Sequence, residues 1–439
     1  MEKILATDAA SCHLSRRTLK DEKITNGVHK AKDPEQGKGR RMYEHATRID
    51  ARIQAMATRL SRSLDANMRR AFLPDNAKEL RKFNAAEAAE LIGVSQDHLR
   101  KQFFNEKLDL EIETDSRGRR WYTAEQIDAA RHTIAHDSRA KKFQYLVPGR
   151  REGDRIQIIS VANFKGGAGK TTSAVHVAQK LALDGYRVLA IDLDPQGSLT
   201  TMFGFRPEIE FAESGTVYDA IRYEDPVPFA DIVRKTYFHN LDLAPAGLML
   251  SEFETETATA LHHNLQPPFY QRLALCIAEV EEYYDVVVID CPPQLGFITL
   301  SALVASTGLL VTVVPSMLDV ASMAQFLQLA SSLMATIADV GAAPEWDFMK
   351  FLITRFEPND GPQTQMAAFL RTMFGDDVLT RTFLKSSAVS DAGLTQQTLF
   401  EVNRSDFTRQ TYDRALESIN GVVSELEDLI QAAWGRREG

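Results

Sequence analysis

The stretch Val161-Ala-Asn-Phe-Lys-Gly-Gly-Ala-Gly-Lys-Thr-Thr172 decides how this chain folds. It ends an apolar, β-branched run that is typical of a buried parallel strand, and it leads into a helical pattern that continues to Asp184 and stops at Gly185. Glycines between a strand and a helix let backbone N–H groups turn inward around a phosphate, and the helix N-terminus adds its partial positive charge. The sequence therefore predicts a phosphate-binding loop.

The side chains of this loop have separate expected roles. Lys170 is placed to reach the β- and γ-phosphates of a nucleotide, and the Thr171 hydroxyl is placed to bind Mg²⁺. Further contacts to the nucleotide are expected from the rest of the loop: Lys165, Gly166, Gly167, Ala168, Gly169 and Thr172. A glycine turn that binds nothing is the alternative, but the strand, the Lys-Thr pair and the helix together disfavour it.

Three aspartates at the ends of later strands complete the predicted site. Asp290 ends an apolar run, where its carboxylate can hold Mg²⁺, directly or through water, beside Thr171. Asp192 and Asp194 follow another apolar run and, being two residues apart, share one face of the extended chain. We expect Asp192 to organise the metal shell and Asp194 to position and polarise an attacking water. The alternative is that either carboxylate only caps a turn.

Lys165 is the unusual feature of the loop, because it lies five residues before Lys170. Two cations so close repel each other unless polyphosphate lies between them. Lys165 could instead cross a dimer interface and neutralise the γ-phosphate in the partner's site, as an arginine finger supplied in trans does. Such fingers contribute about 10³–10⁵ in rate, so hydrolysis would depend on dimerisation. Lys165 and Asp194 are therefore the predicted catalytic residues.

Alternation of strand and helix patterns continues after the loop. Apolar runs that read as strands are at 187–192, 241–245, 286–290, 309–314 and 350–354. This alternation predicts an α/β domain over residues 154–439, with a parallel sheet sandwiched by helices. Ligands of such sheets bind at the carboxyl ends of the strands, where the loop lies.

The chain before residue 154 follows other patterns. Residues 1–40 are polar without periodicity, which predicts a disordered tail, and 137–153 read as a basic linker. Residues 41–74 predict one amphipathic helix with apolar side chains three and four apart. Packing on its own domain and self-association are equally open roles for this helix.

Residues 75–136 resemble a winged helix-turn-helix DNA-binding domain. Asn84 and Glu87 predict a capping box that opens one helix, Gly93 the turn, and Ser95 the cap of a second helix. An arginine-rich turn at 116–122 reads as a β-wing. The expected DNA contacts are Gln96, His98, Arg100 and Lys101 on the second helix and Arg117, Arg119 and Arg120 in the wing. A purely structural helix pair is the alternative.

The distribution of charged residues fits the division of the chain near residue 154. Residues 1–155 hold 32 Lys and Arg against 24 Asp and Glu, whereas the remainder holds 19 against 36. A basic front half indicates contact with a polyanion, although solvated basic faces are also common. The three cysteines lack metal-ligand spacing, which fits a reducing cytoplasm. The sequence contains no run of about 18 uncharged apolar residues, so it predicts no membrane-spanning helix.

Three motifs resemble those of the ParA/MinD-type ATPases. Lys165–Thr172 matches their deviant Walker A motif, signature lysine included, and Asp192–Gly197 and Asp290–Pro293 match two more. Phe164 stands where many relatives carry Gln. Further stretches are similar to the RepA group, the ParA-type partition ATPases of repABC plasmids: 83–100, 186–198, 285–303, 355–365 and 387–402. The resemblance extends from about residue 45 to the end.

This resemblance implies a slow, dimer-dependent ATPase that uses ATP and Mg²⁺ to segregate plasmids. It implies a homodimer that binds chromosomal DNA without sequence preference, a ParB-type centromere-binding partner that stimulates hydrolysis, and repression of its own operon through operator DNA. It also implies a cytoplasmic, nucleoid-associated protein without a membrane partner. Basic candidates for the non-specific DNA contacts are Arg355, Arg381, Lys385, Arg404 and Arg409.

Three other readings share the nucleotide motifs. A repressor whose ATPase is only a ligand sensor would keep the front domain without partition activity. A MinD-like membrane-cycling ATPase needs a basic amphipathic C-terminal helix, and here 422–430 are acidic. An iron-sulfur reductase needs paired interfacial cysteines, a pattern that Cys276 and Cys291 do not supply.

Overall fold

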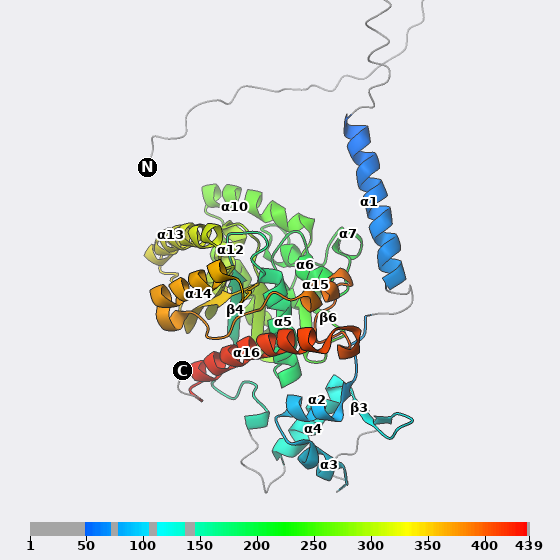
Figure 1. The fold of residues 1–439 in the computed structure, drawn as a ribbon. Coiled ribbons are helices and arrows are strands. Elements are labelled where there is room, and N and C mark those ends of the chain that lie inside the picture. The colour runs from blue at the N-terminus through cyan, green and yellow to red at the C-terminus, as the bar shows by residue number, and fades with distance from the viewer. Residues whose placement is uncertain (1–48, 72–77, 105–111, 137–144, 437–439) are drawn as a thin grey trace, which may run out of the picture. The chain divides into compact units, whose positions relative to one another are not determined.

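The computed structural model describes residues 49–71, 78–104, 112–136 and 145–436 of the chain (Figure 1). The predicted tail (1–40) and most of the predicted linker (137–144) lie outside these ranges. Helix α1 (Ile49–Ala71) corresponds to the predicted amphipathic helix. Its apolar side chains Ile49, Ile53, Met56 and Leu60 are each more than half exposed.

The segment that follows combines three helices with a small antiparallel sheet in the order β1-β3-β2. Its elements are β1 (Phe83–Asn84), α2 (Ala85–Ile92), α3 (Gln96–Phe104), β2 (Glu113–Thr114), β3 (Arg120–Tyr122) and α4 (Ala124–His136). The capping box of α2 is confirmed: the Asn84 carboxamide oxygen accepts from the Glu87 N–H at 3.1 Å, and a Glu87 carboxylate oxygen accepts from the Asn84 N–H at 2.9 Å. Gly93 ends α2 with φ 82°, in the left-handed region that glycine favours.

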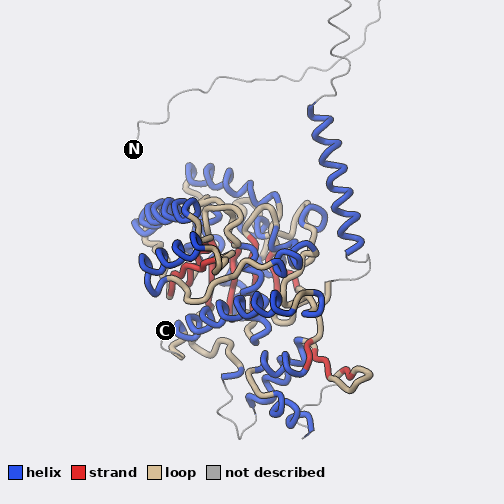
Figure 2. Tube along the Cα trace, viewed as in Figure 1, coloured by secondary structure: helices blue, strands red, loops and turns tan. Residues whose placement is uncertain are grey.

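The main sheet has the strand order β10-β9-β4-β8-β5-β7-β6. Figure 2 shows its strands in red between the helices. The strands are β4 (Gln157–Ala162), β5 (Val188–Asp192), β6 (Arg234–Lys235), β7 (Leu241–Ala244), β8 (Val286–Asp290), β9 (Gly308–Val313) and β10 (Phe348–Ile353). Neighbouring strands pair in parallel, as predicted, except at one edge. There β6, which the apolar pattern did not predict, pairs antiparallel with β7. The sheet is therefore mixed.

Helices cover both faces of this sheet, with α5 and α16 on one side and α12 and α13 on the other (Figure 1). The helices are α5 (Lys170–Asp184), α6 (Ser198–Met202), α7 (Pro207–Glu210), α8 (Val217–Ile221), α9 (Phe229–Ile232), α10 (Glu252–His263), α11 (Phe269–Val280), α12 (Phe297–Ala305), α13 (Met317–Asp339), α14 (Gly361–Phe374), α15 (Ser387–Leu394) and α16 (Arg409–Ala433). Among the described helices α13 is long and apolar enough to cross a membrane by length and composition, a test that helices of soluble proteins also pass.

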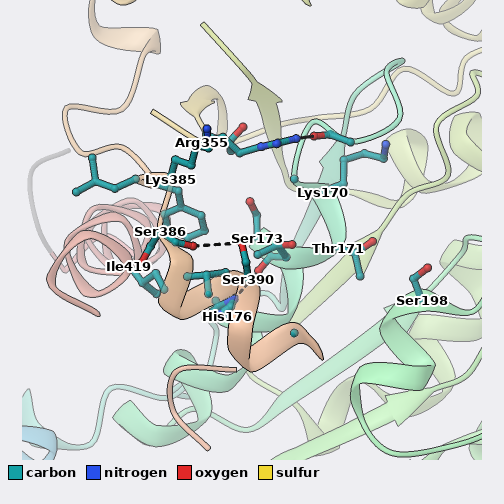
Figure 3. A pocket seen from close by; sticks show the side chains of 18 of the residues that line it. Lys170, Thr171, Ser173, His176, Ser198, Arg355, Lys385, Ser386, Ser390 and Ile419 are labelled. Atoms are coloured by element: carbon teal, nitrogen blue, oxygen red, sulfur yellow. Dashed lines mark hydrogen bonds between the residues drawn. The ribbon is translucent and has the colours of Figure 1, made fainter. Parts of the chain in front are cut away.

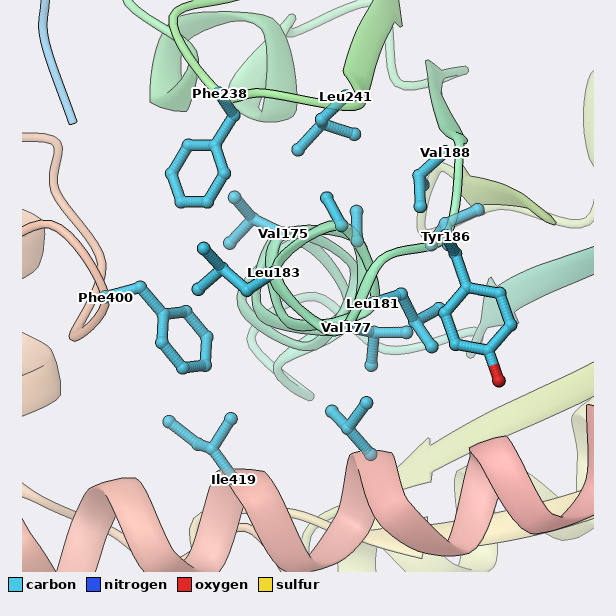
Figure 4. Close-up of a cluster of buried hydrophobic side chains, with 14 of the residues drawn as sticks. Val175, Val177, Leu181, Leu183, Tyr186, Val188, Phe238, Leu241, Phe400 and Ile419 are labelled. Carbon is cyan, nitrogen blue, oxygen red and sulfur yellow. The ribbon is translucent and has the colours of Figure 1, made fainter. Parts of the chain in front are cut away.

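Two apolar clusters form the core, one on each face. Along β8, Val286 and Val288 belong to the first cluster and Val287 and Ile289 to the second. Because successive strand residues point to opposite faces, this alternation buries the strand on both sides. Figure 4 shows the first cluster around α5, with Ile419 of α16 beneath the helix.

Two buried cations join residues 78–136, the front segment, to the domain that contains the main sheet, the main domain. The Arg131 guanidinium on α4 donates to the carbonyl oxygens of Leu91 (2.8 Å) and Leu183 (2.6 Å), so it links α2 to the end of α5. The Lys78 ammonium pairs with the Glu401 carboxylate at 2.6 Å and also donates to the carbonyl oxygen of Met202 in α6 at 2.6 Å. Both cations are thus held between segments that are far apart in the sequence.

Candidate nucleotide-binding site

The predicted phosphate loop lies between the end of β4 and the start of α5. Gly167 and Gly169 have φ values of 78° and 82°, a conformation that L side chains rarely adopt. The loop is held from the side by the residues that follow β10. The Thr354 hydroxyl donates to the Ala168 carbonyl oxygen at 2.8 Å, and the Arg355 guanidinium donates to the Gly167 carbonyl oxygen at 3.2 Å. The turn is therefore braced before any ligand binds.

A cavity of about 570 Å³ opens beside this loop (Figure 3). Its size falls in the range of sites for small molecules and cofactors. One part is lined by the loop itself, with Lys170, Thr171 and Asp194, and the other by residues of α5, α15, α16 and the segment before α15. The second part includes Lys385, which the sequence analysis named as a candidate for DNA contacts.

Lys170 is buried at the start of α5, and its ammonium donates to the Lys165 carbonyl oxygen at 3.2 Å. Burial lowers the pKa of Lys170, and the negative charges of Asp290 and Asp194 oppose that shift. A cation in this setting gains from any further anion that enters the cavity. The residue is thus placed for the phosphate contact that the sequence predicts.

The three predicted carboxylates gather near Thr171 and Lys170. Asp192 is fully buried and accepts hydrogen bonds from the Thr200 N–H and hydroxyl, both at 2.8 Å. Asp194 is half-buried and lines the cavity. Burial, and then the charge of Asp192, raise the pKa of Asp290 far above its usual range.

Asp290 shows that the site fits a divalent cation. Both of its carboxylate oxygens are buried and accept no hydrogen bond from the described residues, although the Thr171 hydroxyl is close enough to lower its pKa. A buried carboxylate without partners is costly, and Mg²⁺ would satisfy it. The described residues contain no cluster of three His, Cys, Asp or Glu side chains that could hold a metal alone. Mg²⁺ is usually held by one or two carboxylates together with phosphates, so Asp290 and Thr171 are the residues that would hold it here.

Lys165 points away from this cluster. Its ammonium forms an ion pair with Asp319 at the start of α13, with 2.8 Å between Nζ and Oδ2. The Lys165 side chain is 39% exposed, and it lines a groove along α13 with Phe164 and Gln325. The two lysines of the loop therefore face different surroundings.

The residues predicted to contact DNA lie on α3, in the β2–β3 turn and on the main domain. Arg119 pairs with Asp115 at 2.8 Å, while Gln96, Arg100 and Lys101 lie on α3, with Arg100 and Lys101 exposed. The remaining predicted contacts of this segment are His98, Arg117 and Arg120. On the main domain, Lys385 pairs with Glu357 at 2.8 Å and Arg404 pairs with Asp413.

Sequence reasoning missed several residues of the site. Asp319 is 154 positions away from Lys165, and no local pattern connects them. The wall formed by Phe383, Ser386 and Ser390 has no motif of its own. His176 could have been noticed, because it lies one turn after Thr172 in the helix that the phosphate loop opens, on the same face as Ser173.

Comparisons with known proteins identify a family model and relatives that are similar to this chain. Residues 156–339 match the family model described as an AAA domain. The protein of Rhizobium rhizogenes that is named Putative replication protein A is 50% identical over 391 residues, which are 88% of this chain and 96% of that protein. Protein SopA of Escherichia coli strain K12 is 30% identical over 371 residues, 82% of this chain and 92% of SopA.

A chromosome-partitioning protein and a solved structure are also similar to this chain. Chromosome partitioning protein ParA of Caulobacter vibrioides is 31% identical over 239 residues, 54% of this chain and 84% of that protein. A solved structure titled Partition Protein has a TM-score of 0.59 at 18% identity and covers 86% of this chain and 98% of its own, so it shows the same fold. The phosphate loop, its two lysines and these relatives together show that the chain belongs to the ParA family of plasmid and chromosome partition ATPases.

Proposed function

We propose that this protein is a plasmid-partition ATPase that hydrolyses ATP slowly and only as a dimer. The observation that carries the proposal is the division of labour between the two lysines of one loop. Lys170 is buried beside the carboxylates, whereas Lys165 faces outward along α13. A second lysine that serves the nucleotide of another subunit needs such an outward position.

Each residue of the site has a role in this reaction. Lys170 and the backbone N–H groups of the loop bind and orient the phosphates. Thr171 and Asp290 would hold Mg²⁺, with Asp192 fixing the neighbouring strand end, and the ion would neutralise charge on the phosphates as it builds up. Asp194, which lines the cavity, orients the attacking water.

The surface around Lys165 favours association with a second copy. Between Asp319 and Asp339 helix α13 carries no charged residue, and its outer face is exposed. The groove beside Lys165 is lined by Phe164, Lys165, Ser322, Gln325, Gln328, Leu329 and Ser332. Interface centres are depleted in charge, so this face fits the subunit contact. There Lys165 of each copy would reach the nucleotide of the other.

The front segment gives the proposed protein a second activity, the binding of operator DNA. Helix α3 follows α2 through the Gly93 turn, and the β2–β3 turn carries Arg117 and Arg119. Recognition helices and wings of this type contact base edges and phosphates. We propose that this winged helix-turn-helix represses the operon. A ParB-type partner would stimulate the ATPase, and nucleoid DNA would bind the dimer.

The decisive measurement is the rate of ATP hydrolysis with and without DNA and the ParB-type partner. We expect a slow basal rate that both additions raise. Lys170→Ala should abolish ATP binding, whereas Lys165→Ala and Asp194→Ala should bind ATP and lose hydrolysis. Equal rates for the wild type and Lys165→Ala would contradict the role of Lys165 across the interface.

Operator binding is tested separately from hydrolysis. The double variant Arg100→Ala/Arg119→Ala should weaken operator affinity in a gel shift at fixed salt and keep the ATPase rate. The charge-matched control is the double variant Arg206→Ala/Arg222→Ala, on the main domain at the start of α7 and the end of α8. Unchanged affinity in the double variant would remove the front segment from DNA recognition.

A repressor in which ATP acts only as a signal is the second candidate. The observation that favours it is the buried link between the front segment and the nucleotide domain through Lys78 and Arg131. Plasmid retention with Asp194→Ala separates the two: partition requires hydrolysis, whereas a nucleotide sensor does not. Sedimentation with anionic liposomes tests the MinD-like alternative, for which we expect no binding.

A further inference from the structure

Two residues that line the part of the cavity beyond the phosphate loop carry polar atoms that find no hydrogen-bond partner in the described part of the chain. Ser173 and His176 lie on the face of α5 that lines the cavity, and both side chains are at least 98% buried. The Ser173 hydroxyl oxygen and His176 Nε2 have no hydrogen-bond partner among the described residues. Buried polar atoms are nearly always paired, so two orphans in one cavity point to a missing ligand.

The hydrogen bond of the other ring nitrogen determines what His176 can offer. Nδ1 lies 2.7 Å from the carbonyl oxygen of Thr172. A carbonyl oxygen can only accept, so Nδ1 carries the proton and Nε2 of a neutral ring is an acceptor. Burial lowers the pKa of His176, which keeps the ring neutral. The orphan atom therefore needs a hydrogen-bond donor.

The lining of this cavity suits an aromatic base. Phe383, Val389 and Ile419 contribute apolar walls, and Figure 3 shows His176 and Ser390 on the side of the cavity away from Lys170. His176 follows Lys170 by six residues, which is about 9 Å along a helix. A nucleotide whose phosphates lie on the loop can thus extend its base toward this end of the same cavity.

We propose that His176 reads the purine base of the bound nucleotide, with Nε2 accepting a hydrogen bond from the exocyclic amine of adenine. This inference rests on the proposed function, since it needs the phosphates on the loop. Guanine carries a carbonyl oxygen where adenine carries the amine, so two acceptors would meet. A buried acceptor without a donor weakens binding on the order of 10- to 100-fold. His176 thereby makes the site selective for adenine nucleotides.

The test removes first the donor on the base and then the acceptor on His176. Calorimetry with Mg²⁺ compares ADP, GDP and purine riboside 5′-diphosphate, which has a hydrogen in place of the amine, on the wild type and on His176→Leu. The wild type should bind ADP about 10-fold more tightly than either analogue. His176→Leu should bind ADP and purine riboside diphosphate equally. The control His239→Leu, a half-buried histidine beside Asp128, should keep the wild-type preference.

Either of two results would overturn the proposal. One is a wild type that binds purine riboside diphosphate as tightly as ADP, in which case a trapped water satisfies His176. The other is the same loss from ADP to the analogue in His176→Leu as in the wild type. If His176→Leu does not fold, His176→Gln replaces it: its amide can turn to donate to guanine, so the ADP-to-GDP affinity ratio should fall about 10-fold. An unchanged ratio contradicts the proposal.

Failure of this inference differs from failure of the proposed function. A protein that binds ADP and GDP equally, and still hydrolyses ATP, would retain its proposed function and lose only the role of His176. A wild type that binds no nucleotide, like the expected Lys170→Ala variant, would overturn the proposed function itself.

Discussion

The ammonium of Lys165 and the carboxylate of Asp319 form an ion pair within one chain, 2.8 Å apart. The Asp319 side chain is only 9% exposed, and the Ser316 hydroxyl also contacts it. If Lys165 serves the nucleotide of a partner subunit, this pair has to open before the dimer closes. The isolated chain therefore keeps its second lysine occupied.

Asp319→Asn should make dimer-dependent hydrolysis easier. Because the ion pair is partly exposed, it is worth about 1 kcal/mol or less, and its loss should lower the protein concentration at half-maximal ATPase rate by about two- to fivefold. The measurement is ATPase rate against protein concentration at saturating ATP. Asp339→Asn, at the other end of α13, is the control. A higher concentration requirement for Asp319→Asn would mean that Asp319 helps Lys165 across the interface.

Asp290→Asn should stabilise the protein in the absence of Mg²⁺ while abolishing hydrolysis. The pKa of Asp290 is raised on folding, so its contribution to stability falls as pH rises from about 4 through the folded pKa. At pH 8 the wild type carries this penalty and the amide does not. Melting temperatures in EDTA at pH 8 and pH 5 check this, with the exposed Asp376→Asn as control. A lower melting temperature for Asp290→Asn at pH 8 would show that its charge is already compensated.

Protonation of Asp128 should weaken the link between the front segment and the main domain at acid pH. Burial opposes its charge, but hydrogen bonds from His239 and Asn240 and the charge of Arg131 outweigh burial and lower the pKa of Asp128 to about 2. Its contribution, about 2 kcal/mol, is complete above pH 4 and is lost as pH falls from about 4 to 2. Urea unfolding between pH 3 and pH 6 should show a smaller pH dependence for Asp128→Asn than for the wild type. Identical slopes would rule out this contribution.

The Lys78–Glu401 pair should give strongly non-additive stabilities. Lys78→Met leaves the Glu401 carboxylate, which is fully buried, without its cation and should cost about 3–5 kcal/mol. Lys78→Met/Glu401→Gln should cost much less than the sum of the two single variants, because it removes both charges. Denaturant unfolding of the four proteins completes the cycle, and Lys82→Met, whose partner Glu113 is exposed, is the matched control. Additive costs would show that the pair is not coupled.

The elements that could be predicted from the sequence are those with local signals. β8 covers the predicted range 286–290, and β4 leads into the phosphate loop as predicted. α2 begins at its predicted capping box, and α5 ends at Asp184 as predicted. β6 has only two residues and no apolar run, so nothing in its sequence distinguished it. Its antiparallel pairing follows from the tertiary structure alone.

The residues of the site also fall into two groups: those that short motifs predict, and those that only contacts between distant segments place there. Lys170 and Asp290 belong to short motifs, and the structure brings them together. The basic side chains were harder to assign, because charge alone does not tell a surface from a pocket. Arg355 holds the phosphate loop and Lys385 lines the cavity, two positions that are decided by contacts between distant segments. Whether either also binds DNA stays a prediction.

The buried Lys78 ammonium has a consequence for how such proteins can be recombined. It donates to carbonyl oxygens of Met202 and Gln396 and pairs with Glu401, so its coordination comes from three separate places in the nucleotide domain. A chimaera that takes residues 78–136 from one relative and the nucleotide-binding domain from another inherits the Lys78 charge without the groups that surround it here. Natural exchange and laboratory grafting should therefore succeed only when the crossover point lies before Lys78 or when all three places are carried along with it.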